Sequence, residues 1–222
     1  MGMKEQTPLR RASGVSHDQL VAHWRDVHAP GVRAHMRPDR YAITFFDPRG
    51  GRAPFDGMAS LAYDDAAFGV AHTGRHTPAA VVADGFGERV EVPLARTRVV
   101  EHVIVAGPAG PGGPAATVEE REAAFKMTFL VSANPGEDLA SLHRHWLEVH
   151  APNVASAFIP AGGVRYVVNL ADPSVPRRAF AGIAEIWYRD QATAKAHRVD
   201  EDGFNDRSTR IALPGREWVV EP

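Results

Sequence analysis

The sequence has no cysteine among its 222 residues. This excludes disulfide bridges, thiolate catalysis and cysteine-ligated metal sites. The formal net charge is only −2 and no basic run is present, so nucleic acid is a poor candidate partner. The first residues, "MGMKEQTPLRR", lack the apolar stretch of a signal peptide, and no apolar run approaches membrane-spanning length. We therefore expect a cytoplasmic globular protein, for which an apolar fraction of 44% allows a core.

What the chain does contain is one sequence motif that occurs twice. "HWRDVHAP" at 23–30 returns as "HWLEVHAP" at 145–152, with six of eight letters identical. Three more pairs of segments match in the same order, which indicates an internal duplication. These pairs are 55–65 with 180–190, "DGF" at 84–86 with "DGF" at 202–204, and "RVVE" at 98–101 with "WVVE" at 218–221.

A stretch rich in glycine, proline and alanine, "GPAGPGGPAA", separates the two copies and is typical of a linker. We predict copy 1 at residues 1–106, the linker at 107–117 and copy 2 at 118–222.

Each copy has the pattern of a β-α-β-β-α-β unit, which is the ferredoxin-like arrangement. Such a sheet carries both helices on one face, so its other face needs a partner. We predict an α+β fold in which the two ferredoxin-like repeats pack sheet to sheet as an α+β barrel within one chain. The alternative is that each half pairs with a half of a second chain. The first strand of copy 1, "MKEQTPLRR", is polar and contains Pro8, so an edge or frayed strand is expected there.

The repeated motif is predicted to lie on a helix with one apolar stripe. The stripe residues are Leu20, Trp24, Val27 and Gly31 in copy 1, and Leu142, Trp146, Val149 and Asn153 in copy 2. On a straight α-helix, His23 and His28 would lie about 140° apart, which argues against joint metal binding. If the helix ends before Pro30, its carbonyl end would raise the pKa of His28. If Pro30 instead opens a new helical segment, that effect is lost.

The pattern helix–HW–x–x–VHAP, followed by strands and an acidic helix cap, resembles the EthD family of the dimeric α+β barrel superfamily. The resemblance covers residues 16–105 and 124–221. It implies a small-molecule cavity and usually no cofactor. The superfamily contains dehydratase- or cyclase-like proteins of polyketide pathways, lactone isomerases, monooxygenases and some haem enzymes, so the fold does not define the reaction.

Histidine exchanges protons near neutral pH without a cofactor, so the matched histidines are the candidate acids or bases. The candidate catalytic residues are His150, His28, His145 and His23. Because copy 1 has the weaker first strand, the sequence favours His150 as the acid/base and a structural role for His28. The candidate substrate-binding residues are Tyr41, Tyr166, Tyr63, Tyr188, Trp24, Trp146, His72 and His197. A packing or capping role is the alternative for each of them.

No metal site is predicted, because Gly74 interrupts His72-x3-His76 and His197-x3-Glu201 resembles a charged helix end. We predict an enzyme that uses histidine acid/base chemistry, as a lyase, isomerase or cyclase, on a small apolar carbonyl or phenolic compound. No cofactor, nucleic acid or membrane is expected, and a homodimer is possible. The alternatives are a cofactor-free monooxygenase and a non-catalytic small-molecule-binding protein.

Overall fold

The computed structural model describes residues 2–48, 54–91, 96–110, 112–175, 179–197 and 210–220. The chain has a mixed α/β fold and forms two compact units. Unit 1 comprises Met1–Arg98 with Trp218–Pro222, and unit 2 comprises Val99–Glu217. None of the helices in the described residues is both long and apolar enough to cross a bilayer.

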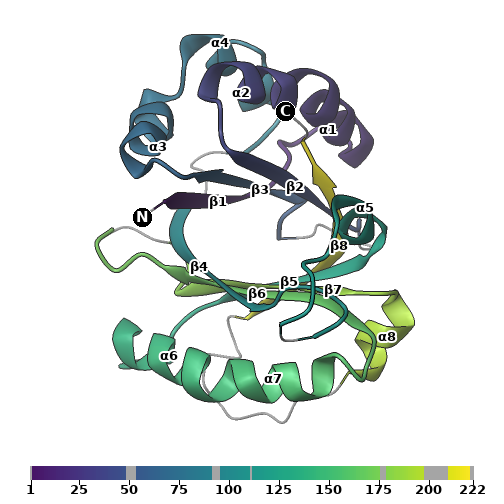
Figure 1. Cartoon of the computed structure of the whole chain (residues 1–222). Coiled ribbons are helices and arrows are strands. Elements are labelled where there is room, and N and C mark those ends of the chain that lie inside the picture. Colours follow the sequence, from purple (N-terminus) through teal and green to yellow (C-terminus); the bar gives the residue numbers. More distant parts are fainter. Residues whose placement is uncertain are drawn as a thin grey trace. The chain divides into compact units, whose positions relative to one another are not determined.

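Unit 1 is a helix-covered antiparallel sheet with the strand order β1-β3-β2. Figure 1 shows α1–α4 gathered on one face of these strands. The strands are β1 (Met3–Leu9), β2 (Arg40–Phe46) and β3 (Gly57–Tyr63). The helical elements are α1 (His17–His23), η1 (Trp24–His28), α2 (Ala29–Met36), α3 (Ala66–His72), η2 (Gly74–His76), α4 (Ala79–Val82) and η3 (Phe86–Glu88).

Strand β1 is not frayed. It is buried along its length and pairs with β3 over all seven residues, from Met3 opposite Tyr63 to Leu9 opposite Gly57. Its polar side chains have partners: the Gln6 amide donates to Ser60 Oγ, and Glu5 pairs with Arg96. These partners lie far away in the sequence, which is why the strand looked weak when judged by composition alone.

Unit 2 contains antiparallel strands in the order β8-β5-β7-β6-β4, with α6, α7 and α8 on one face (Figure 1). The strands are β4 (Thr97–Val105, which begins in unit 1), β5 (Phe125–Val131), β6 (Gly163–Ala171), β7 (Gly182–Tyr188) and β8 (Ile211–Val219, which ends in unit 1). The helical elements are α5 (Val118–Ala123), α6 (Leu139–His145), η4 (Trp146–His150), α7 (Ala151–Phe158) and α8 (Gln191–Ala196). The short helix α5 was not predicted, although Thr117 and Glu120 form a capping box at its start.

The repeated motif contains a π-helical turn in both units, at Trp24–His28 and at Trp146–His150. The N–H of Ala29 donates to the carbonyl of Trp24, and that of Ala151 donates to Trp146, five residues back in each case. Pro30 has no N–H, and its ring would clash with the carbonyl four residues earlier in an α-helix. The wider turn relieves this clash, so the helix continues through Pro30 and no helix terminus lies beside His28.

The π turn also shifts the buried stripe by one residue. The predicted stripe is wrong after Trp24, because Val27 is 45% exposed while Ala29 is buried. In unit 2 Val149 is likewise 41% exposed. The buried positions are Leu20, Trp24, Ala29, Val32 and Met36 in unit 1, and Leu142, Trp146, Ala151, Val154 and Phe158 in unit 2.

A glycine at the start of the third strand of each copy makes room for the tryptophan. A Cβ atom on Gly57 would lie 2.7 Å from Cζ3 of Trp24, and one on Gly182 would lie 2.6 Å from Cζ3 of Trp146. The indole therefore packs directly on the backbone. Tryptophan and glycine are matched across the two copies because neither fits this contact without the other.

Candidate functional site

A cavity of about 220 Å³ lies between the sheet and the helices of unit 1. The π-turn helix contributes Trp24, His28, Val32 and Met36 to its wall. Most of the remaining wall is apolar and comes from the strands and from the segment 74–90. An apolar cleft with a few polar groups is the usual form of a small-molecule site. The other lining residues are Thr7, Leu9, Tyr41, Ala59, Leu61, Gly74, Thr77, Val81, Val82, Phe86, Gly87, Val90 and Arg96.

His28, which lines this cavity, forms a close pair with Asp84, which is not itself a lining residue. Nδ1 of His28 lies 2.6 Å from Oδ2 of Asp84, and their side chains are only 15% and 10% exposed. A carboxylate at this distance accepts the proton of Nδ1, which leaves Nε2 as the free lone pair of the neutral ring. This is the tautomer that a general base needs.

The loop that follows α4 holds Asp84 in place. The other carboxylate oxygen of Asp84 accepts the backbone N–H of Phe86 at 2.8 Å. The Phe86 ring stacks on the His28 ring with a centroid distance of 3.8 Å and an interplanar angle of 10°. One three-residue segment, "DGF", therefore fixes both the rotation of the imidazole and the position of its proton.

The pKa of His28 lies below its ordinary value of 6.5. Burial is the largest cause and lowers the pKa, because it disfavours the charged imidazolium. The hydrogen bond and charge of Asp84 act in the opposite direction, while His23 and Arg96 lower the pKa further. His28 is therefore mostly neutral at pH 7 and can accept a proton.

Tyr41 supplies a hydroxyl group to the same cavity. Its oxygen accepts the indole N–H of Trp24 at 3.3 Å, which leaves the phenolic O–H as a donor. Burial raises the pKa of Tyr41 well above 10, so the hydroxyl stays protonated at neutral pH. A protonated tyrosine beside a neutral histidine can stabilise an oxygen on which negative charge develops.

Of the candidate residues in unit 1, Trp24, His28 and Tyr41 meet at the cavity, whereas His23, Tyr63 and His72 do not line it. The π turn brings His23 and His28 to the same aromatic ring, with His23 6.3 Å from the Phe86 centroid, which the straight-helix projection did not predict. Nε2 of His23 is buried without a hydrogen-bond partner in the described part of the chain. Nδ1 of His72 lies 2.8 Å from the carbonyl of Phe68, which is a helix-end contact.

The candidate residues of unit 2 occupy matching positions in that unit. His145 ends α6 and His150 ends the π turn, while Trp146 is buried against Gly182. Phe158 packs near the ring of Tyr166, and the hydroxyl of Tyr188 lies 2.8 Å from Nδ1 of His197. The counterpart of Asp84 would be Asp202, which lies outside the described residues, as does Glu201 of the weak metal pattern.

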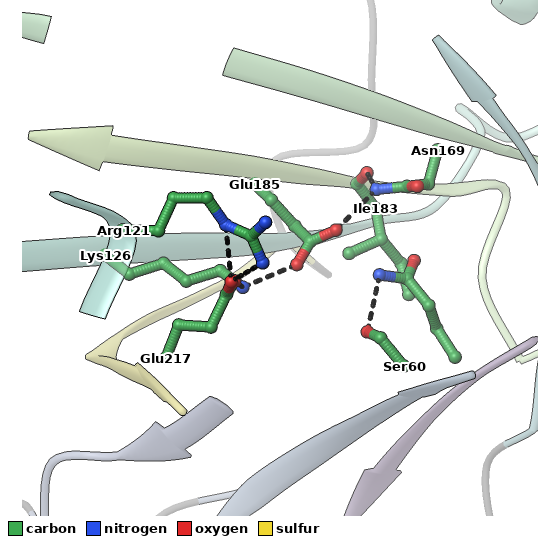
Figure 2. Close-up of polar contacts among 8 residues, drawn as sticks. Ser60, Arg121, Lys126, Asn169, Ile183, Glu185 and Glu217 are labelled. Carbon is green, nitrogen blue, oxygen red and sulfur yellow. Dashed lines mark hydrogen bonds and ion pairs between the residues drawn. The ribbon is translucent and has the colours of Figure 1, made fainter. Parts of the chain in front are cut away.

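Unit 2 also contains a buried ionic cluster on the face of its sheet away from α6 and α7. Figure 2 shows Lys126 between two carboxylates, with Nζ 2.6 Å from Oε1 of Glu185 and 2.8 Å from Oε2 of Glu217. Arg121 pairs with Glu217, and the Asn169 amide donates to Glu185 at 2.8 Å. Burial raises the pKa of Glu217, but Lys126 and Arg121 outweigh it and hold that pKa below its usual range. Each buried carboxylate is paired with a cation, which offsets part of the cost of removing these charges from water.

The described residues contain no group of three or more histidine, aspartate or glutamate side chains placed to hold a metal ion. The cavity of unit 1 instead offers the His28 base, the hydroxyl residues Tyr41, Thr7 and Thr77, and the Arg96 guanidinium group in apolar surroundings. This set of groups suits proton transfer on an organic molecule.

Sequence reasoning missed Asp84 and Arg96. The repeat of "DGF" at 84–86 and 202–204 was a signal for Asp84, since an acidic residue retained with its neighbours in both copies needs an explanation. No sequence pattern pointed to Arg96, because it is far from the histidine and the tyrosine of the cavity in the sequence and joins them only in the folded chain.

Comparison with known proteins finds a match of residues 134–206 to the EthD domain family. The matched residues include the second copy of the repeated motif, at 145–152, whose resemblance to this family was predicted. No curated protein matches the chain.

Solved structures share the fold over nearly the whole chain. A candidate monooxygenase from Fusobacterium nucleatum subsp. nucleatum is 11% identical with a TM-score of 0.61, over 98% of this chain and 93% of that one. An anthrone oxidase-like protein is 10% identical with a TM-score of 0.61, over 99% and 92%. A mutant chlorite dismutase from Candidatus Nitrospira defluvii is 10% identical with a TM-score of 0.55, over 96% and 91%. At these identities the likeness shows the fold alone.

Proposed function

We propose that the chain is a cofactor-independent enzyme that transfers a proton on a small, largely apolar carbonyl or phenolic compound. The observation that carries this proposal is the pairing of His28, which lines an apolar cavity, with Asp84 at 2.6 Å, together with Tyr41 in the lining of the same cavity. The geometry moves the proposed base from His150 to His28. The weak first strand was the reason for preferring His150, and β1 is a complete strand.

In the proposed reaction, Nε2 of His28 removes a proton from a carbon next to the substrate carbonyl. The electron pair of the broken C–H bond moves onto the carbonyl oxygen, where the Tyr41 O–H donates a hydrogen bond. Asp84 stabilises the imidazolium that forms, as a carboxylate does for a catalytic histidine. Return of the proton to another carbon gives isomerisation, and transfer to a leaving hydroxyl group releases water and gives elimination.

The reaction can be tested without knowledge of the natural substrate. We would incubate 2-tetralone in D2O and follow loss of the α-proton signals by NMR, with wild-type protein, His28→Ala and His35→Ala. His35 is an exposed residue of α2 and serves as the matched histidine control. Exchange catalysed by wild type and His35→Ala but not by His28→Ala is expected. Exchange at the same rate in all three samples would contradict the proposal.

A cofactor-free monooxygenase is a second candidate, supported by the same phenol-binding groups and by the names of two structures that share the fold, a candidate monooxygenase and an anthrone oxidase-like protein. Oxygen uptake in the presence of anthrone would favour this alternative over proton transfer alone. A non-catalytic binding protein would show neither exchange nor uptake.

The same proposal includes the tandem arrangement. We take the chain as two ferredoxin-like repeats packed sheet to sheet, in the manner of the dimeric α+β barrel proteins. The π turn before Ala-Pro and the tryptophan–glycine contact, each present in both units, support a common origin of the halves.

A further inference from the structure

We propose that Arg96 selects substrates that carry an anionic oxygen, such as a phenolate or a carboxylate, on a skeleton of one or two rings. This inference rests on the proposed function, because it assigns a substrate class to the same cavity.

Arg96 is the one residue with a permanent charge among the described residues that line the cavity. The acidic residues near it, Glu5 and Asp84, do not line the wall. Asp84 is engaged by His28 and by the backbone of Phe86. The other polar side chains in the lining, those of Thr7, Thr77, Trp24, Tyr41 and His28, carry no permanent charge. A ligand with a negatively charged oxygen complements this set of groups.

Glu5 orients Arg96 without using up its hydrogen-bonding capacity. Nη1 of Arg96 donates to Oε1 of Glu5 at 3.1 Å, and the Arg96 side chain remains 35% exposed. A guanidinium group has five N–H donors in a planar arrangement that matches a carboxylate. Donors therefore remain for a ligand after the Glu5 bond is made.

The size of the cavity limits the skeleton of the ligand. An apolar protein cavity of about 150 Å³ binds benzene. The cavity here, at about 220 Å³, is larger by roughly the volume that a second fused ring would need. Leu9, Val81 and Met36 are among the apolar lining residues that such rings could contact.

The charge of Arg96 also lies close enough to matter for the proposed base. Arg96 is among the groups that lower the pKa of His28, after the larger effect of burial. Both residues line the cavity, so a ligand whose anionic oxygen is held by the guanidinium would occupy the same cavity as the base.

The test compares two probes of equal shape and different charge, 2-naphthoate and 2-naphthalenemethanol. Their affinities would be measured by calorimetry for wild type, Arg96→Gln, Arg96→Lys and Arg10→Gln. Arg10 is the matched control, because its side chain is 36% exposed and pairs with Glu91 but does not line the cavity. Circular dichroism would confirm that each variant is folded.

Wild type and Arg10→Gln should prefer 2-naphthoate over the alcohol by roughly 10- to 100-fold, the range expected for hydrogen bonds to a charged group. Arg96→Gln should lose the preference, and Arg96→Lys should keep part of it because it keeps the charge. Equal affinities in wild type, an undiminished preference in Arg96→Gln, or no binding of either probe would overturn the inference.

This outcome is separable from that of the proposed function. His28→Ala should retain the preference for 2-naphthoate, because binding does not need the base. Histidine-dependent exchange without any anion preference would leave the proposed function intact and remove only this inference. Anion preference without exchange would support the substrate class assigned here and contradict the proposed proton transfer.

Discussion

His28 and Asp84 are 56 positions apart in the chain, yet Nδ1 of one lies 2.6 Å from Oδ2 of the other. The pair joins the π-helical turn to the loop after α4, and its histidine lines the cavity. Its geometry assigns a separate role to each ring nitrogen, one bound to the carboxylate and one available to a ligand.

Asp84→Asn should reduce the exchange rate by roughly 100-fold or more. An asparagine amide can donate to Nδ1, which favours the tautomer with its proton on Nε2 and removes the base. The pH below which the residual rate falls should also decrease, because the carboxylate raises the pKa of His28 and its loss lowers that pKa. A rate-versus-pH profile measures both effects, with the exposed Asp26→Asn on the same helix as control. A profile identical to wild type would contradict the role of Asp84.

The stability of the folded protein should decrease as the pH falls from 7.5 to 5. In the unfolded chain His28 takes up a proton near its ordinary pKa of 6.5, whereas the folded protein resists protonation because its pKa is lowered. The unfolded state therefore binds more protons below this value, and unfolding becomes more favourable. His28→Gln should show a smaller loss over this interval in urea denaturation, while His35→Gln should follow wild type. Parallel curves for His28→Gln and wild type would be inconsistent with the lowered pKa.

Gly57→Ala should destabilise the protein by about 1–3 kcal/mol, because the new methyl group would overlap the Trp24 ring. Displacement of Trp24 should also disturb Tyr41 and weaken binding of 2-naphthoate. Gly182→Ala should cost similar stability in unit 2 but leave this binding unchanged. Gly31→Ala is the control, because its added methyl group meets no atom within 4 Å and should stabilise the helix slightly. Equal loss of binding in Gly57→Ala and Gly182→Ala would not fit a cavity confined to unit 1.

Lys126→Met should lower the free energy of unfolding by about 3–5 kcal/mol, because it leaves the buried carboxylates of Glu185 and Glu217 without their shared cation. The lysine is only 1% exposed and its Nζ also lies 4.2 Å from the centre of the Trp187 ring. Chemical denaturation gives the value, and Lys195→Met on the exposed side of α8 should stay within about 0.5 kcal/mol of wild type. A Lys126→Met loss below about 1 kcal/mol would mean that the cluster contributes little to stability.

The sequence predicted most strands well, because the alternation of apolar and polar residues along a strand and the turn residues at its ends are local properties. Strands β2, β4 and β5 coincide with the apolar segments "RYAITFF", "TRVVEHVIV" and "FKMTFLV", and Asp65 and Asp190 cap α3 and α8. The π turn was not predictable from an α-helical projection, because it arises where Pro30 conflicts with the turn before it. The resulting one-residue shift exposes Val27, buries Ala29 and brings His23 and His28 to the same ring.

The candidate site was predicted in part. His28, Tyr41 and Trp24 were identified because they recur in both copies, and all three line the cavity. Arg96 and Asp84 were missed as site residues, because their contacts depend on tertiary packing between segments that are distant in the sequence. The strength of β1 was misjudged for the same reason, since Glu5 and Gln6 obtain their partners from distant segments.

The most direct test of the central claim compares His28→Ala with His150→Ala in the exchange of 2-tetralone α-protons in D2O. Loss of a general base typically costs a factor on the order of 10²–10⁴ in rate. We predict a loss of this size for His28→Ala and a rate within a few-fold of wild type for His150→Ala. Both variants should remain folded by circular dichroism. A large loss in His150→Ala together with a near-normal rate in His28→Ala would contradict the account and place the chemistry in unit 2.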